Sequence, residues 1–383
     1  MRKTEKMTKL KSNQKGITLI ALVITIIVLL ILAGVAISML SGENGILRQA
    51  AKAKEQTEKK STLEQVQLAA MDALMRGSDL TSIENETNLS DALTSQGLNE
   101  AEVDGEAATG YTVTVKDKTY KVASDGTVVE KSIVDYITAT NYGDYIKGYK
   151  DLADIEGTDK DWQVFYNDGK NVWIIASDYV QLDATTASKA GMVTNGYYAW
   201  WDSVPSNGEK YPNGKCAAEL AKSDNWEAYL DKSLATKAMG GPTIEMFSES
   251  YNSKYPVTDE NNGIIDYQLQ TTASNEGYQV RWNKTGTESW TTYIRGVTDT
   301  ASNGMYLKTG TLDVTLRAYA YWLASPSAVK SSCVMYVRST GLVDLNATYG
   351  TTIVGVRPVV CLKSDILVTS TTTDGITTWT IQK

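Results

Sequence analysis

A run of aromatic residues beside a carboxylate is the clearest candidate for ligand contact in this sequence. Tyr197, Tyr198, Trp200 and Trp201 are followed directly by Asp202. Aromatic rings can stack on the face of a sugar while a neighbouring carboxylate accepts hydrogen bonds from its hydroxyls, and Tyr and Trp are common at binding surfaces. Alternation along a strand could equally send some of these rings inward. The run therefore predicts either ligand contact or core packing.

Short motifs typical of serine acyl-transfer enzymes are present, but their order is wrong. Ser327–Lys330 has the spacing of a nucleophile motif, and Ser223–Asn225 and Lys308–Gly310 have the composition of its two companions. In those enzymes the nucleophile comes first and starts a helix, whereas here it comes last, after Pro326. The chain also has no histidine, the commonest general base near neutral pH. We therefore predict that the protein is not an enzyme and uses no cofactor.

One oxygen-rich segment has the spacing of a calcium loop. It runs from Asp259 to Gly263 and continues to Asp266, but the twelfth position, where a bidentate glutamate is expected, is Gln270. We interpret the segment as a solvated turn and predict no metal site.

Net charge excludes one class of partner. The whole chain carries −8, and the first 16 residues carry +5, so residues 17–383 carry −13. Nucleic-acid binding depends on a basic surface. We therefore expect no nucleic-acid partner.

The elements that must position these residues fall into two groups. Apolar residues at helical spacing predict a helix over 46–76, and alternating β-branched runs at 111–115, 119–122 and 126–129 predict a small antiparallel sheet. A module of one long helix and one small sheet should end near Lys131.

The remaining residues predict a larger mixed α+β domain. Residues 162–166 and 171–175 flank an Asn-Asp-Gly turn and predict a hairpin. Helices are expected over 216–221, over 226–239 and after the sequence Gly-Gly-Pro at 240–242. Later apolar runs predict further strands. Two of these contain Cys333 and Cys361, for which a disulfide and two separate thiols both remain open.

An uncharged run follows a basic N-terminus. No charged residue lies between Lys15 and Glu43, and the apolar stretch Ile17–Leu40 has the length of a membrane-spanning helix. Basic residues beside a membrane-spanning helix stay on the cytoplasmic side. We therefore predict a single-pass protein of the cell membrane, in contact with membrane lipid and with its C-terminal part outside.

The basic leader, Gly16 and the following apolar stretch resemble the class III signal of type IV prepilins and pseudopilins. The resemblance implies that a prepilin peptidase cuts between Gly16 and Ile17 and that Ile17 becomes the methylated first residue. Most members carry a glutamate at the fifth mature position, where this chain has Ala21. In that family, the carboxylate of this glutamate offsets the buried N-terminal ammonium of a neighbouring subunit. Its absence favours a minor or tip subunit among other pilin subunits.

The C-terminal part carries a second resemblance. Tyr321–Ser325, Tyr336–Arg338 and Gly355–Val360 are similar, in order, to the ending of C-type-lectin-like domains of the formylglycine-generating-enzyme and bacterial surface-protein branch. The segment Gly240–Met246 resembles a Gram-positive surface domain with the same ending. Such domains hold variable loops for ligand binding. The cysteine pair of the enzyme branch is absent, so the resemblance implies no catalysis.

Together these observations predict an α+β chain in four parts. They are a prepilin leader over 1–16, a pilin-like membrane-spanning and amphipathic helix over 17–76, a small pilin-like β module over 77–131, and a C-terminal C-type-lectin-like binding domain over 132–383. The predicted function is a minor pilin-like or pseudopilin-like surface subunit, in a pilus or pseudopilus, that presents an adhesion domain for a carbohydrate or protein ligand. The alternative is a stand-alone membrane-anchored extracellular binding protein outside any filament.

Overall fold

The computed structural model describes most of the chain after residue 45. Its described residues are 23, 24, 26, 27 and 46–382, with gaps at 79, 117, 153–159, 202–214, 257–262, 271–276, 285, 298–303, 308–319, 329–332 and 348–353. The chain divides into two compact units, Met1–Glu130 and Lys131–Lys383.

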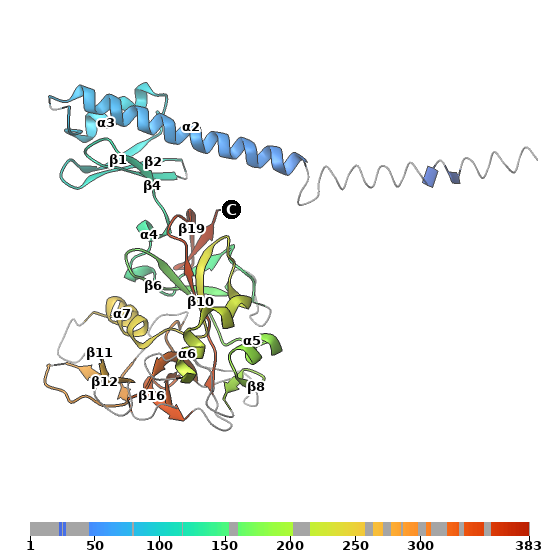
Figure 1. Ribbon diagram of the computed structural model, residues 1–383. Helices are drawn as coiled ribbons and strands as arrows, with labels where there is room; N and C mark the ends of the chain where they lie inside the picture. The colour runs from blue at the N-terminus through green and yellow to red at the C-terminus, as the bar shows by residue number, and fades with distance from the viewer. Residues whose placement is uncertain are drawn as a thin grey trace, which may run out of the picture. The chain divides into compact units, whose positions relative to one another are not determined.

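The small unit packs two helices on an antiparallel sheet (Figure 1). Its helices are α2 (Ile46–Arg76) and α3 (Glu86–Ser95). Its sheet has the order β1-β2-β3-β4, with bounds Glu102–Glu106, Gly110–Val115, Lys118–Val122 and Val128–Glu130. The predicted helix over 46–76 and the predicted strands are confirmed by these elements.

Small side chains of α2 form its contact with the sheet. Val66, Ala69, Ala70 and Ala73 recur at helical spacing and are fully buried. They share one core with apolar residues of α3 and with inward-facing residues of β2 and β3. Burial of such a stripe is the main source of stability for a helix of this composition.

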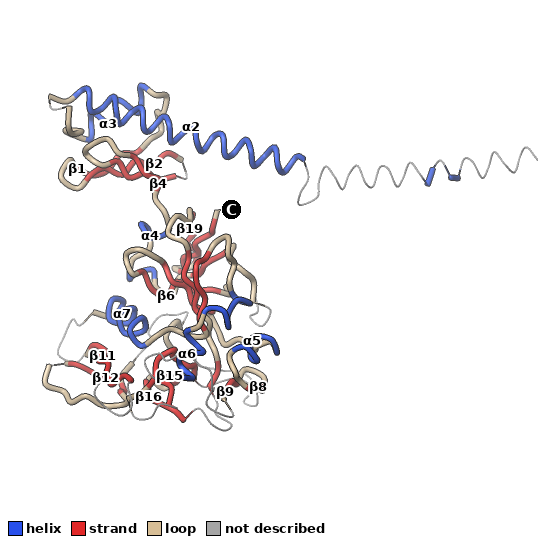
Figure 2. The backbone as a smooth tube through the Cα atoms, in the orientation of Figure 1, coloured by secondary structure: helices blue, strands red, loops and turns tan. Residues whose placement is uncertain are grey.

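A seven-stranded sheet forms the centre of the large unit (Figure 2). Its order is β10-β18-β7-β6-β5-β20-β19. These strands are β5 (Tyr145–Lys147), β6 (Trp162–Asn167), β7 (Val172–Ala176), β10 (Ala235–Met239), β18 (Val359–Leu362), β19 (Val368–Thr373) and β20 (Ile376–Ile381). The predicted hairpin is confirmed as β6 and β7, which pair antiparallel. β20 pairs in parallel with β5, so the first and last parts of this unit meet inside one sheet.

A second sheet of five strands has the order β13-β16-β15-β14-β17. Its strands are β13 (Ile294–Arg295), β14 (Ala320–Pro326), β15 (Cys333–Arg338), β16 (Leu342–Ala347) and β17 (Val354–Gly355). Two hairpins form two-stranded sheets of their own: β8 (Val193–Asn195) with β9 (Tyr198–Trp200), and β11 (Ile264–Gln270) with β12 (Gly277–Asn283).

Short helices pack on these sheets. They are α4 (Ile133–Tyr136), α5 (Ala184–Lys189), α6 (Lys215–Ala221), α7 (Ile244–Lys254) and the 3₁₀ helices η1 (Ala139–Asn141) and η2 (Ser223–Tyr229). α7 contacts β6 of the first sheet, β14 of the second sheet and β11. It therefore joins three parts of the large unit.

One segment passes directly from the second sheet to the first. β17 pairs in parallel with β14, and β18 then lies antiparallel between β7 and β10. Between them Val356 forms a single antiparallel bridge with Val180. All four residues of β18 are buried. This segment holds the two sheets together through backbone hydrogen bonds.

The predicted transmembrane helix needs correction. Within the described part of the chain, no helix is both long and apolar enough to cross a membrane. Of the expected stretch 17–40, only four residues are described, and they are helical. The long helix α2 carries charged residues from Arg48 to Arg76. The fold class is therefore a mixed one of helices and several sheets, with no membrane-spanning helix among the residues that the structure describes, and the cell-membrane location that depended on such a helix is withdrawn.

One finer prediction is wrong, and the two cysteines left open by the sequence are now placed. The helix expected over 226–239 is wrong, because η2 ends at Tyr229 and Ala235–Met239 form strand β10 against β18. Cys333 and Cys361 lie in different sheets as buried thiols and form no disulfide with each other. Burial also raises the pKa of the Cys361 thiol, which makes it a poor nucleophile.

Tyr149 generates a prediction for alkaline solution. Its hydroxyl donates to the carbonyl of Tyr229 at 3.1 Å and accepts from the amide of Asp231 at 3.0 Å. Burial raises its pKa from 10.0 to about 12. Above pH 10 the unfolded chain loses a proton that the folded chain keeps, so the stability present below pH 10 is lost as pH rises toward 12. Between pH 9 and 11 this residue should remove about 1 kcal/mol from the free energy of unfolding.

Urea unfolding of the wild type and of Tyr149→Phe at pH 9 and pH 11 measures this effect. The variant should be less stable than the wild type at pH 9, because two hydrogen bonds are lost. The further fall in its free energy of unfolding between pH 9 and pH 11 should be about 1 kcal/mol smaller than that of the wild type. Tyr293→Phe is the control, since Tyr293 is 52% exposed. Equal pH dependence in the wild type and Tyr149→Phe would contradict the prediction.

Candidate functional site

The aromatic run singled out in the sequence lies around strand β9. Trp201 is fully buried, its Nε1 donates to the carbonyl of Ala190 at 2.9 Å, and its ring lies 5.7 Å from that of Trp322. Trp200 is also buried, whereas Tyr197 and Tyr198 are partly exposed and pack against the core. These positions put Trp201 in the core and leave the two tyrosines as the members with accessible surface.

Several other residues singled out in the sequence lie outside the described residues. They are Gly16, Ile17, Ala21, Asp202, Asp259, Lys308 and Lys330. Ser327 is described and is 1% exposed, and its amide donates to the carbonyl of Cys333 at 3.1 Å.

Sequence reasoning missed a group that the fold brings together around helix α7. We call it the Tyr–Glu cluster, and its members are Tyr166, Glu245, Glu249, Tyr267 and Tyr278. The carboxylate of Glu249 accepts hydrogen bonds from the hydroxyls of Tyr166 and Tyr267, the latter at 2.8 Å. Glu245 accepts from the hydroxyl of Tyr278 through Oε1. The tyrosines come from β6, β11 and β12, so no local sequence pattern could reveal the group.

Helix α7 sets the position of both carboxylates. Thr243 caps its start, its hydroxyl accepting from the amide of Met246 at 3.3 Å, and the amide of Ile244 donates to the buried Ser325 hydroxyl of β14 at 2.9 Å. Glu245 and Glu249 are four residues apart and therefore lie on one face of the helix. The preceding Gly241 permits this docking, because a Cβ there would lie 2.3 Å from the carbonyl oxygen of Trp322.

The electrostatics of the cluster are those of an uncompensated acidic site. In the part of the chain that the structure describes, neither Glu245 nor Glu249 forms an ion pair. Burial, and then the Glu249 carboxylate, raise the pKa of Tyr166 and Tyr267, so both hydroxyls remain donors. Glu249 itself is exposed and keeps further acceptor positions. Oε2 of Glu245 is buried without a hydrogen-bond partner.

The described residues contain no group of three acidic or thiol side chains that could hold a metal ion. Two carboxylates framed by aromatic rings suit an organic cation better, since ammonium groups are attracted both to carboxylates and to ring faces.

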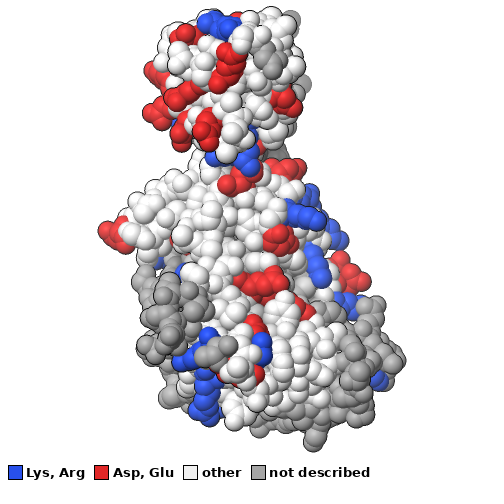
Figure 3. All heavy atoms as spheres, turned by 90° about the vertical axis from the view of Figure 1, so that its left-hand side faces the viewer, with Lys and Arg blue, Asp and Glu red and all other residues white. Residues whose placement is uncertain are grey.

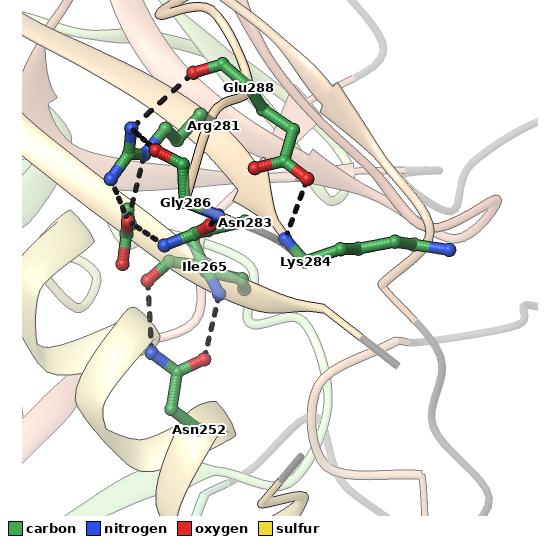
Figure 4. Close-up of polar contacts among 8 residues, drawn as sticks. Asn252, Ile265, Arg281, Asn283, Lys284, Gly286 and Glu288 are labelled. Atoms are coloured by element: carbon green, nitrogen blue, oxygen red, sulfur yellow. Dashed lines mark hydrogen bonds and ion pairs between the residues drawn. The ribbon is translucent and has the colours of Figure 1, made fainter. Parts of the chain in front are cut away.

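Hairpin β11–β12 carries two of the tyrosines and is fastened to α7 by Asn252. Its side-chain amide donates to the carbonyl of Ile265 at 2.9 Å and accepts from the amide of Ile265 at 2.8 Å (Figure 4). The Asn252 side chain thus pairs with the backbone N–H and C=O of Ile265, as the backbone of a neighbouring strand would. Tyr267 is therefore held at a fixed distance from the helix.

The opposite face of this hairpin is held by a polar network. Oδ2 of Asp266 accepts from Arg281 Nε at 2.8 Å, from Arg281 Nη2 at 2.8 Å and from Asn283 Nδ2 at 2.7 Å. Arg281 also donates to the carbonyl oxygens of Gly286 and Glu288 in the following loop (Figure 4). Its guanidinium lies 4.5 Å from the ring of Trp290. The network stiffens the hairpin from the side away from α7.

Charged side chains are distributed differently on the two units. All charged residues from 77 to 110 are acidic, and Figure 3 shows Asp and Glu side chains over the visible face of the small unit. They are Asp79, Glu84, Glu86, Asp91, Glu100, Glu102, Asp104 and Glu106. The visible face of the large unit has broad uncharged areas with a few charged groups.

Comparisons with family models, with curated proteins and with solved structures find no match for this chain. Its function is therefore argued from the Tyr–Glu cluster and the elements that hold it.

The Asp266–Arg281 pair generates a prediction for the stiffness of hairpin β11–β12. Asp266→Asn removes the charge but keeps the shape, so Arg281 loses its charged acceptor in a partly buried place. We expect the free energy of unfolding to fall by about 1–2 kcal/mol. Amide hydrogen exchange at residues 281–291 should accelerate. Chemical denaturation and exchange measured by mass spectrometry test both effects.

The matched control is Glu227→Gln. Glu227 pairs with Lys189 at 3.0 Å, but both side chains are more than 40% exposed, and such pairs contribute little. If both substitutions had the same effect, or exchange in the loop were unchanged, the stiffening role of Asp266 would be excluded.

Proposed function

We propose that this protein is a pilin-like binding subunit whose large unit binds a protein ligand through the Tyr–Glu cluster. The ligand presents a lysine side chain, whose ammonium group lies against Glu249 and the rings of Tyr166 and Tyr267. The observation that carries the proposal is that Glu249 is exposed, fixed by two tyrosine hydroxyls and without a cationic partner among the described residues.

Charge supports a cationic ligand. Glu245 and Glu249 place two like charges four residues apart on one helix, an arrangement that destabilises a helix slightly unless a cation lies near. The only basic residue of α7 is Lys254, whose ammonium group donates to the carbonyl of Tyr142 instead. A lysine from a partner would offset both charges, and complementary charge of this kind favours specific and rapid association.

The aromatic part of the cluster supports a protein ligand. Tyrosine is enriched in binding surfaces because it offers a large ring with few rotatable bonds. Tyr267 and Tyr278 pack edge to face at 6.4 Å, and Tyr142 and Tyr166 do so at 6.3 Å. Since the rings are already fixed by each other and by the carboxylates, ligand binding would order few side chains.

The small unit supports the pilin-like part of the proposal. One long helix lies on a four-stranded antiparallel sheet, which is the arrangement that the resemblance implies for such a module. In this proposal the small unit is the part that joins other subunits, and a prepilin peptidase processes the chain between Gly16 and Ile17.

Binding is tested with a short lysine-containing peptide and the full chain. We expect saturable shifts in NMR signals of residues 245–249 and 267–278, and at least a tenfold weaker affinity for Glu249→Gln, because one charged contact is lost. Glu227→Gln, an exposed acid on another surface, should bind as the wild type does. A norleucine-containing peptide, which lacks the ammonium group, should bind weakly. Equal affinity of Glu249→Gln, or saturable binding of N-acetylglucosamine oligomers at the same residues, would contradict a lysine-binding role.

Processing is tested separately by intact mass. Co-expression with a prepilin peptidase should give a product that begins at methylated Ile17, and Gly16→Leu should leave the chain uncut. A wild-type chain that retains Met1–Gly16 would contradict the pilin-like assignment without affecting the ligand-binding test.

A further inference from the structure

A fully buried arginine lies at the point where the chain passes between the two sheets. Arg357 has no exposed surface. Its Nε donates to the carbonyl of Ala176 at 3.0 Å and its Nη1 to the carbonyl of Met305 at 2.6 Å. Its guanidinium also lies 5.0 Å from the ring centre of Tyr321. Its Nη2 has no hydrogen-bond partner, and no carboxylate among the described residues forms an ion pair with it.

A second buried polar group without a partner faces the same place. Tyr179 is 2% exposed, and its hydroxyl has no hydrogen-bond partner among the described residues. Val180 and Val356 form an antiparallel bridge. Tyr179 precedes the first of these residues and Arg357 follows the second, so the two side chains flank the same bridge. Burial raises the pKa of the Tyr179 hydroxyl, and the positive charge of Arg357 opposes that rise by a smaller amount.

The acid next to Tyr179 in the sequence forms no ion pair with Arg357. Asp178 neighbours Tyr179, but its Oδ1 accepts a hydrogen bond from the backbone amide of Tyr179 at 2.8 Å. Among the described residues, Arg357 is therefore a buried cation whose partners are two carbonyl oxygens and one aromatic ring. A buried charge without an opposite charge is strongly unfavourable, and buried donors are rarely left without an acceptor.

We propose that the large unit binds a chloride ion between Nη2 of Arg357 and the hydroxyl of Tyr179. Both groups are donors, as an anion requires, and together they supply one formal positive charge for one negative charge. Full burial of Arg357 restricts the ligand to a small ion, because a carboxylate or phosphate group attached to a larger molecule would have to enter the core. The bound ion would stabilise the passage from β17 to β18 and with it the contact between the two sheets.

Stability at constant ionic strength tests the site. The full chain is melted in sodium gluconate and in mixtures in which chloride replaces gluconate. A ligand that binds only the folded state raises the melting temperature in a saturable way. We expect the transition of the large unit to rise by about 2–4 °C, while that of the small unit, assigned by hydrogen exchange, stays unchanged.

Two variants separate ion binding from a general effect of salt. Tyr179→Phe keeps the ring and removes only the hydroxyl, so it should fold. The chloride concentration that gives half of the rise in melting temperature should be at least tenfold higher than for the wild type. Arg357→Met removes the charge and should abolish the response. Crystals grown in bromide should show an anomalous peak within hydrogen-bonding distance of Nη2.

Three results would overturn the proposal. The first is a melting temperature that does not depend on chloride, and the second is a response of Tyr179→Phe equal to that of the wild type. The third is a bromide crystal without a peak at Arg357. If Arg357→Met does not fold, Tyr179→Phe and the bromide crystal still decide the question. None of these measurements involves the Tyr–Glu cluster, so either proposal can fail alone.

Discussion

The large unit depends on the segment that carries the chain from its second sheet to its first. Within nine residues, Val354 and Gly355 extend the sheet of β14, and Val359–Leu362 then insert between β7 and β10. Backbone pairing on both sides fixes the two sheets relative to each other. The guanidinium of Arg357 adds hydrogen bonds to Ala176 at the end of β7 and to Met305 from a distant part of the chain. A polar side chain at the centre of this contact specifies one arrangement, because an apolar replacement would leave both carbonyls without donors.

The candidate site follows from this arrangement through helix α7. The helix begins against β14. There the hydroxyl of Ser325 accepts a hydrogen bond from the amide of Ile244, and the carbonyl of Pro242 accepts one from the amide of Ala324. Along its length it contacts β6, and the buried hydroxyl of Ser250 donates to the carbonyl of Phe165 in that strand. Its exposed face can therefore bring two glutamates to tyrosines that lie up to 112 positions apart in the sequence. The cluster is fixed by elements whose positions are set by the core, so its geometry does not depend on the ligand.

Local patterns were sufficient to predict much of the secondary structure. The helix over 46–76 and the hairpin of β6 and β7 both have strong local signals, because apolar residues recur at helical spacing in the first and an Asn-Asp-Gly turn separates the two strands of the second. The segment 226–239 was misread as helical. Its alanine and lysine content favours a helix, but pairing with β18, more than 120 positions later, makes Ala235–Met239 a strand. Pro242 lies just before the cap at Thr243 and not in the first turn of the helix.

The site was less accessible to sequence reasoning, for a physical reason. The aromatic run at 197–201 was conspicuous because its members are adjacent, yet the indole of Trp201 is in the core. Glu245 and Glu249 could have been placed on one helix face from their spacing. Nothing local showed that three tyrosines from other strands would donate to them, because strand pairing and the docking of hairpin β11–β12 decide that.

The parallel pairing of β5 with β20 has a consequence for synthesis on the ribosome. The small unit contains all of its own strands by residue 130, so it can fold while the rest is still being translated. The first strand of the large unit is β5, whose neighbour β20 is made more than 200 residues later. Strand β18, which pairs with β7 and β10, is also late. The half-built strands of the large unit stay exposed until then. Nascent chains of this protein should therefore need protection by chaperones during translation of the large unit.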